Sequence, residues 1–336
     1  MQHILSLQGD DLHRLETLVF PKIATGETIL FLGSGASVTD EKCYLSKEII
    51  DYYSDAKGIK LETTDITDFV DTLSATPDFN RDEFDEYVAM LLKKLKVSDT
   101  HKVIAATPWK EIITTNYDLL IESAFSAVEG TTQESLKCTP IRDASSYNYR
   151  PANDEVKYVK LNGCLSDKKR YKFVFSSKDF ERSKKFYTGV LRSLENLSPQ
   201  INFLSVGYSY SDAFAKRLLE RFDKINFRHK KWLFSLDPFV EDARLDYFAS
   251  QRICVVRALA KDFFEAYRVW EEANTKNYNA RRNTILRTPE KRSFNVSAQV
   301  RKRLEGNILQ LVEGNSFRKI TANDYYLGEE PKRLFT

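Results

Sequence analysis

Short apolar runs recur through the first 274 residues, and amphipathic segments separate them. The runs lie at Thr28–Leu32, Glu111–Thr115, Val156–Leu161, Ile201–Val206, Lys231–Leu236 and Arg252–Val256. Apolar runs of this length, separated by helical patterns, are typical of parallel strands joined by helices. Residues 1–274 are therefore expected to form an α/β domain, with a parallel sheet covered by helices on both faces.

A long segment between the first two runs, at about residues 40–110, is expected to be a helical insert. Its apolar residues recur at spacings of three and four, which is one face of an amphipathic helix. These residues are Phe84, Tyr87, Val88, Leu91, Leu92 and Leu95. Further helices are predicted at about Leu119–Ala127 and Asp212–Phe222, the second with Asp212 as its N-cap.

Residues 275–336 differ in charge from the rest of the chain. They hold 13 basic and 6 acidic residues, a net charge of +7, whereas residues 1–274 carry −4. Val300, Leu304, Ile308 and Leu311 fall on one face of a predicted helix in this segment. We expect a basic, partly helical extension that contacts the domain, another copy of the chain or a partner. A solvated basic surface is the alternative.

Composition favours a soluble globular protein, with 42% apolar and 29% charged residues. No apolar run approaches the ~20 residues of a membrane helix, and the N-terminus turns acidic too early for a secretory signal. The net charge of +3 gives no general nucleic-acid signal. Cys43, Cys138, Cys164 and Cys254 form no CxxC pair, which argues against a zinc ribbon or a disulfide framework. A cytoplasmic protein with neither a metal nor a membrane contact is expected.

Glycine-rich and polar motifs follow the predicted strands, at the edge where parallel sheets bind ligands. They are Gly33-Ser34-Gly35-Ala36-Ser37, Thr114-Thr115-Asn116-Tyr117-Asp118, Lys160-Leu161-Asn162-Gly163, Gly207-Tyr208-Ser209-Tyr210-Ser211-Asp212 and Ser235-Leu236-Asp237-Pro238. Glycines in the first motif would let the backbone approach a phosphate, and a helix N-terminus after it would favour the phosphate charge. Taken singly, each motif also fits a tight turn or a helix cap.

Taken together and in this order, the motifs resemble the sirtuin superfamily, and more closely the bacterial sirtuin-like domains of antiviral defence. The resemblance covers about Ile23–Ala258 and implies a Rossmann-like, doubly wound domain that binds NAD⁺. It implies that Gly33, Ser34, Gly35, Ala36 and Ser37 line the pyrophosphate and that Thr115 and Tyr117 flank the cofactor beside Asn116 and Asp118. It also implies that Gly207 and Ser209 meet the phosphate and adenosine ribose, that Asp237 reaches the adenine ribose, and that the backbone near Cys254 flanks the adenine.

In the same resemblance, Asn116 would position the nicotinamide ribose and a water molecule, and Asp118 would hold the nicotinamide carboxamide. The chain departs from the family in two respects. The cysteine spacing excludes the zinc module of protein-deacetylating sirtuins, which favours the defence branch and its hydrolysis of NAD⁺. Asn162 stands where the family has a histidine base, and an amide cannot take up a proton near neutrality as imidazole does.

Loss of a general base costs roughly 10²–10⁴ in rate, so Asn162 predicts impaired catalysis. Three interpretations stay open: an inactivated variant, a natural member whose base lies elsewhere, and a natural non-catalytic binder. The four histidines lie outside the motifs, and a surface or structural role is expected for them, although His101 or His229 could replace the base if the fold brings it to the site. They are His3, His13, His101 and His229.

The leading hypothesis is an NAD⁺ hydrolase that acts as the effector of a bacterial antiviral system and releases nicotinamide and ADP-ribose. By resemblance, it would form a homo-oligomer controlled by a separate protein, either a hexameric DNA-translocase-type ATPase or a short Argonaute. The alternative is a non-catalytic NAD⁺ or ADP-ribose sensor that gates a partner. A protein deacylase and a nucleic-acid-binding protein are less favoured.

Overall fold

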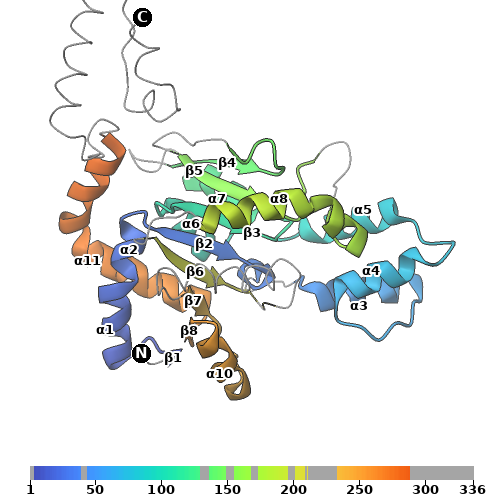
Figure 1. Ribbon diagram of the computed structural model, residues 1–336, viewed down its shortest axis with the longest axis horizontal. Coiled ribbons are helices and arrows are strands. Elements are labelled where there is room, and N and C mark those ends of the chain that lie inside the picture. Colours follow the sequence, from blue (N-terminus) through green and yellow to red (C-terminus); the bar gives the residue numbers. More distant parts are fainter. Residues whose placement is uncertain are drawn as a thin grey trace, which may run out of the picture. The chain divides into compact units, whose positions relative to one another are not determined.

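The computed structural model describes residues 4–38, 44–128, 136–148, 155–167, 173–195, 201–208, 210 and 233–287, with side chains through residue 274. Within this part of the chain, eight strands form one sheet in which every neighbouring pair is parallel (Figure 1). The strands are β1 (Ile4–Leu5), β2 (Thr28–Leu32), β3 (Glu111–Thr114), β4 (Lys137–Ile141), β5 (Glu155–Lys160), β6 (Asn202–Val206), β7 (Leu233–Leu236) and β8 (Ile253–Val256).

The strand order, β1-β8-β7-β6-β2-β3-β5-β4, identifies where the winding reverses. From β2 the chain moves outward to β3 and the edge strand β4, and β5 fills the place between them. The chain then returns to the other side of β2 to form β6, β7 and β8. In the β2 register, Leu32 lies opposite Thr114 of β3 and Val206 of β6. This arrangement confirms the doubly wound, Rossmann-like α/β fold, and its switch point lies between the ends of β2 and β6.

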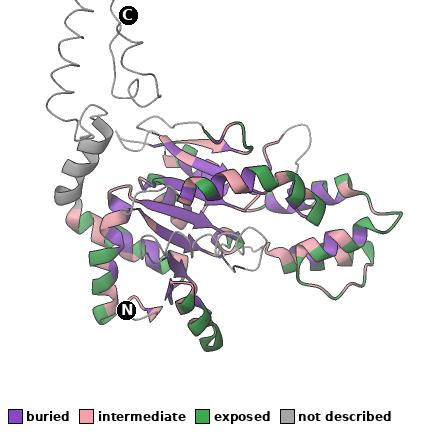
Figure 2. Cartoon of the chain, in the orientation of Figure 1, coloured by how far each residue is buried: buried purple, intermediate pink, exposed green. Residues whose placement is uncertain are grey.

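Helices cover the sheet and build the insert. They are α1 (Gly9–Leu18), α2 (Phe20–Ala24), α3 (Ser46–Lys57), α4 (Ile66–Ser74), α5 (Arg81–Leu92), α6 (Asp99–Ala106), α7 (Leu120–Val128), α8 (Ser177–Glu195), α10 (Asp242–Ser250) and α11 (Ala260–Arg287). The inner strands are buried, the edge strand β4 is largely not, and the outer faces of the helices are exposed (Figure 2). Continuous apolar runs are therefore explained by burial of the sheet on both faces.

The predicted insert contains α3 to α6, and Figure 1 shows α3, α4 and α5 together at one end of the sheet. These helices have their own apolar core, to which Phe69 and Phe84 contribute. Phe173 and Phe175, from the segment just before α8, belong to the same core. The insert is therefore packed directly against a segment of the α/β domain.

Six predicted strands lie within two residues of their expected bounds in the described part of the chain. Two strands were not predicted. β1 has only two residues, and β4 contains Pro140, which suits its place at the sheet edge because proline cannot donate to a ladder. The predicted helix at 212–222 and the segment 288–336 lie outside the described residues. No helix among the described residues is long and apolar enough to cross a membrane.

The predicted boundary at residue 274 falls within α11. By itself, the part of the chain from Met1 to Thr275 forms one compact unit. The separate role of residues 275–336 stays a prediction.

Candidate functional site

The glycine turns after β2 and β6 pack backbone to backbone at the switch point. Gly33 N donates to Val206 O at 3.0 Å, and Gly35 N donates to Gly207 O at 3.0 Å. A Cβ on Gly33 would lie 2.4 Å from Gly207 O, and one on Gly207 would lie 2.1 Å from Ala36 N. Gly207 also has a φ of +64°, in the left-handed region that favours glycine. The two turns thus require glycine for their mutual contact.

The first glycine turn is a single 3₁₀ turn over Ser34–Ser37. The next helix described is α3, which begins only at Ser46. Residues 39–43 lie outside the described residues, so the expected helix N-terminus after this turn stays a prediction. Val38, which follows the turn, has an extended backbone.

Hydrogen bonds join the turns after β2 and β3. Asn116 Nδ2 donates to Gly33 O at 2.8 Å and to Ser37 Oγ at 2.9 Å. Ser37 Oγ donates to Asp118 Oδ2 at 2.6 Å. Asp118 is buried, and its Oδ1 accepts a hydrogen bond from Leu120 N at the start of α7. The structure therefore brings together Asn116, Asp118 and Ser37, which come from two different motifs.

An ion pair between Lys160 and Glu122 supports the turn after β3. The side chain of Lys160, at the end of β5, is fully buried. Its Nζ donates to Asp118 O and, at 3.0 Å, to Glu122 Oε1 of α7. Burial alone would lower the pKa of Lys160, but the nearby Glu122, Cys164 and Asp118 outweigh it and raise that pKa. Lys160 is therefore a fixed cation that locks β5 to the Asp118 turn.

Asn162 lies at the end of β5 and is held by two elements. Its side-chain Oδ1 accepts a hydrogen bond from Tyr187 Oη of α8 at 2.9 Å, and its backbone O accepts one from Val174 N at 2.9 Å. The turn that carries it is bonded to the β3 turn, since Leu165 N donates to Tyr117 O at 2.9 Å. Asn162 thus lies beside the predicted site, but its amide is not a titratable group.

His101 of α6 approaches the first glycine turn, although no motif contains it. Ser98 N–H lies 3.1 Å from Nδ1, so Nδ1 accepts that bond, and Nε2 carries the proton that it donates to Ala36 O at 3.0 Å. Burial lowers the pKa of His101, despite the opposing effect of Asp118. His101 is therefore a neutral residue with both ring nitrogens engaged, and the other described histidine, His13, lies on α1.

Tyr117 and Thr115 contribute to the scaffold of this edge. Tyr117 Oη donates to Val174 O at 2.9 Å, and its ring contacts Phe173, which directs this side chain toward the insert. Thr115 N donates to Leu32 O at 3.3 Å. Ser34 is exposed on the glycine turn. Their predicted contacts with a cofactor stay predictions.

On the β7 and β8 side, Asp237 follows the strand end and its Oδ1 accepts a hydrogen bond from Phe239 N at 3.0 Å. Phe239 is 83% exposed, so its aromatic ring is open to solvent two residues after Asp237, the predicted ribose contact. Cys254 lies within β8, paired with Phe234 and buried, and burial raises its pKa to about 12. Cys254 thus lies two residues before the end of β8, and the expected contact of the backbone near it with the adenine stays a prediction. Ser209 lies outside the described residues.

Sequence reasoning did not identify the roles of Tyr187, His101 or Lys160. Lys160 was part of a quoted motif, but nothing local indicates that its ammonium reaches Asp118. Tyr187 follows the apolar face of α8, whose pattern predicts burial and not a bond to Asn162. Each of these contacts joins elements far apart in the sequence, which explains why no local signal marks it.

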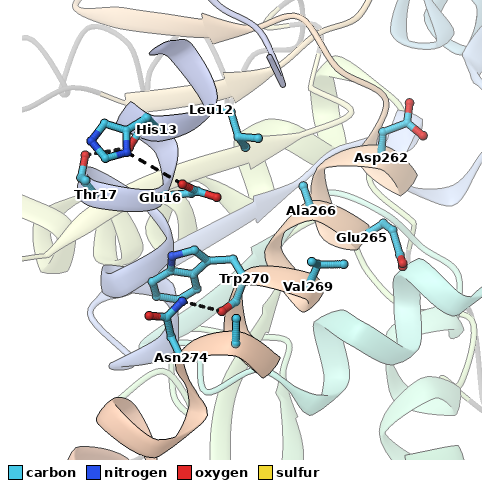
Figure 3. Close-up of a pocket in the computed structure, with 11 residues that line it drawn as sticks. Leu12, His13, Glu16, Thr17, Asp262, Glu265, Ala266, Val269, Trp270 and Asn274 are labelled. Atoms are coloured by element: carbon cyan, nitrogen blue, oxygen red, sulfur yellow. Dashed lines mark hydrogen bonds and ion pairs between the residues drawn. The ribbon is translucent and has the colours of Figure 1, made fainter. Parts of the chain in front are cut away.

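A groove of about 740 Å³ lies between α1 and α11, and its lining contains none of the predicted site residues (Figure 3). Leu12, Val269 and Trp270 supply apolar surface, while Glu16 and Glu265 are acidic. Because its lining shares no residue with the carboxyl edge, the groove is not part of the candidate site.

Comparison with known proteins agrees with the geometry of this edge. Residues 110–256, less than half of the chain, match the family model described as a SIR2-like domain. The match runs from just before β3 to the last residue of β8, so it includes Asn116, Asp118 and Asn162 but not the first glycine turn. No curated protein matches the chain. The match supports a place in the sirtuin-like superfamily and an NAD-related function.

Among the described residues, no group of three or more histidine, cysteine, aspartate or glutamate side chains is placed to hold a metal ion. Of the described cysteines, Cys138, Cys164 and Cys254 are not joined in a disulfide. The expected absence of a metal stays a prediction.

Proposed function

We propose that the chain binds NAD⁺ along the carboxyl ends of β2, β3, β6 and β7 and hydrolyses the bond between nicotinamide and ribose. The observation that carries this proposal is the hydrogen-bonded set of Asn116, Ser37 and Asp118 at the switch point. Two motifs that the resemblance assigns to one dinucleotide are there joined directly. Open α/β sheets bind their ligands at such a point.

In this proposal, the turn over Gly33–Ser37 faces the pyrophosphate, and Gly207 and Ser209 meet the phosphate and adenosine ribose. Asn116 orients the nicotinamide ribose and the attacking water. Asp118 accepts from the nicotinamide carboxamide, which replaces or shares the bond that Ser37 Oγ makes to Oδ2. Asp237 reaches the adenine ribose.

Cleavage of the bond between nicotinamide and ribose needs only limited assistance from a general base. The nicotinamide ring of NAD⁺ carries a positive charge, so it takes the electron pair of the broken C–N bond and leaves as a neutral molecule without a proton. Water forms the new bond to the ribose carbon of an oxocarbenium-like transition state and releases one proton, which gives ADP-ribose. Positioning and electrostatics thus support residual activity, and a base at position 162 would accelerate the reaction.

The test is nicotinamide release from NAD⁺ by the unaltered chain and by Asn162→His, each with and without the product of a neighbouring gene. We expect Asn162→His to be faster by roughly 10²–10⁴, the range for general-base assistance. Asn116→Ala in the Asn162→His background is the control, and it should abolish the gain. Absence of both NAD⁺ binding and cleavage in Asn162→His would overturn the proposal.

A second candidate is a non-catalytic NAD⁺ or ADP-ribose sensor that gates a partner protein. Asn162 favours it, because its Oδ1 is already held by Tyr187 and the nearby His101 has both nitrogens engaged. Tight NAD⁺ binding without turnover in all four assays would support this candidate against the hydrolase.

For the biological setting, we propose a cytoplasmic effector of bacterial antiviral defence, assembled as a homo-oligomer and controlled by a separate protein. By the resemblance in its motifs, that protein is a hexameric DNA-translocase-type ATPase or a short Argonaute. The net charge of +7 on residues 275–336 motivates placing the subunit or partner contact there. Depletion of NAD⁺ would then stop the metabolism of the infected cell.

A further inference from the structure

Arg81, the first residue of α5 in the helical insert, uses its guanidinium to hold three groups. Nε donates to Asp85 Oδ1 at 2.7 Å, Nη1 to Asp179 Oδ2 at 2.7 Å, and Nη2 to Phe173 O at 2.8 Å. Asp85 lies on the same helix, while Phe173 and Asp179 belong to the α/β domain. One side chain thus ties the insert to the domain at two points.

The first of these points leads to the backbone of Asn162. Phe173 O accepts from Arg81, and the next residue, Val174, donates its N–H to Asn162 O at 2.9 Å. Val174 O in turn accepts from Tyr117 Oη at 2.9 Å. A short backbone segment held by Arg81 therefore contacts both the Asn162 turn and the residue between Asn116 and Asp118.

The second point leads to the side chain of Asn162. Asp179 Oδ2 accepts from Arg81 and also from Ser176 N at 3.1 Å, so Arg81 supports the first turn of α8. The same helix carries Tyr187, whose Oη donates to Asn162 Oδ1 at 2.9 Å. Both hydrogen bonds that hold Asn162 are therefore made by groups on the segment that Arg81 fixes.

We propose that Arg81 is a positioning residue for the site, acting through Val174 and α8 on the residue at position 162. Its consequence for turnover rests on the proposed function. The helical insert is then part of the scaffold of the site, and a partner that moves α5 would change the geometry at position 162. The guanidinium suits this task because its planar fork presents several donors in fixed directions.

A second arginine provides a matched control. Arg182 of α8 also pairs with Asp179, at 3.6 Å, but its side chain is 68% exposed. The Arg81 side chain is 26% exposed. Loss of Arg182 removes an exposed ion pair, which is worth little, and leaves the Phe173 contact intact.

The first experiment measures amide hydrogen exchange in the full, unliganded chain, so its result does not depend on NAD⁺. In Arg81→Gln, we expect the Val174 and Leu165 amides to exchange about tenfold faster or more, since the segment that orders them is released. Amides of β3 should not change, and Arg182→Gln should match the unaltered chain. Unchanged exchange at Val174, or equal acceleration throughout the sheet, would overturn the proposal.

Arg81→Gln leaves the buried Asp85 carboxylate without its cation, and burial already raises the pKa of Asp85 to about 6. The double variant Arg81→Gln/Asp85→Asn removes that charge and is used if the single variant does not fold. It should show the same local acceleration at Val174. Protection equal to that of the unaltered chain would contradict the proposal.

The second experiment adds the Arg81→Gln change to Asn162→His and measures nicotinamide release. A mispositioned base should lower kcat by about tenfold or more while KM changes less than about threefold, because substrate binding is preserved. Local acceleration of exchange with unchanged kcat would overturn the positioning role. If Asn162→His neither binds nor cleaves NAD⁺, the proposed function fails, and the exchange result still decides whether Arg81 fixes this segment.

Discussion

Gly207 has no space for a side chain, because a Cβ there would lie 2.1 Å from Ala36 N. Sequence reasoning explained the glycines of the first turn by approach to a phosphate. The structure gives a further reason, since Gly33 and Gly35 contact the backbone of Gly207 so closely that none of the three tolerates a Cβ. A mutation at these glycines therefore tests packing as well as ligand binding.

At this residue scale, we predict that Gly207→Ala destabilises the protein by roughly 3 kcal/mol, through overpacking and a left-handed backbone. Gly58→Ala is the matched control, because Gly58 has a similar φ of +67° but open space around it. It should cost about 1 kcal/mol, and urea unfolding followed by circular dichroism measures both. Equal losses in the two variants would mean that the contact between the turns contributes nothing.

At the scale of elements, Lys160 couples β5 to α7. Its ammonium is fully buried and lies between Asp118 O and Glu122 Oε1, so it joins the strand that carries Asn162 to the helix that follows Asp118. A buried ion pair adds little or no net stability compared with well-packed apolar residues, but removal of one partner leaves an uncompensated charge. The ammonium group thus adds to the β3–β5 ladder in placing the two strand ends.

We predict that Lys160→Met destabilises the chain by about 3 kcal/mol, since the partly buried Glu122 loses its cation and Asp118 O loses its buried donor. Lys184→Met is the control, because Lys184 pairs with Glu181 on the exposed face of α8 and is 58% exposed. That variant should change stability by less than about 1 kcal/mol. Denaturant unfolding measures the free energy of unfolding of both variants. A Lys160→Met protein as stable as the control would refute the role of the ion pair.

At the scale of the whole molecule, the order of the strands decides which motifs meet. β2 lies between β3 and β6, so turns that are distant in the sequence close on one another at the switch point. The basic segment 275–336 belongs to the same scale, because its proposed role is assembly. Its net charge of +7 contrasts with −4 on the rest of the chain.

We predict that deletion of residues 275–336 lowers the oligomer size or abolishes complex formation with the regulatory protein. A full-length chain with Arg301→Glu, Lys302→Glu and Arg303→Glu should show the same loss if charge carries the contact. Size-exclusion chromatography with light scattering gives the mass. An unchanged mass and an unchanged complex in the deletion variant would rule out this role for the segment.

The sequence alone determined the local features of this protein. Runs such as Thr28–Leu32 predicted the central strands because a buried parallel strand is apolar on both faces, and the turn residues after them marked the site edge. Only the tertiary structure decided which side chains meet there. Ser37 reaches Asp118 across 81 residues, and Arg81 reaches Asp179 across 98. Periodicity and turn chemistry act over a few neighbouring residues, whereas such contacts depend on strand order and on the packing of helices against the sheet.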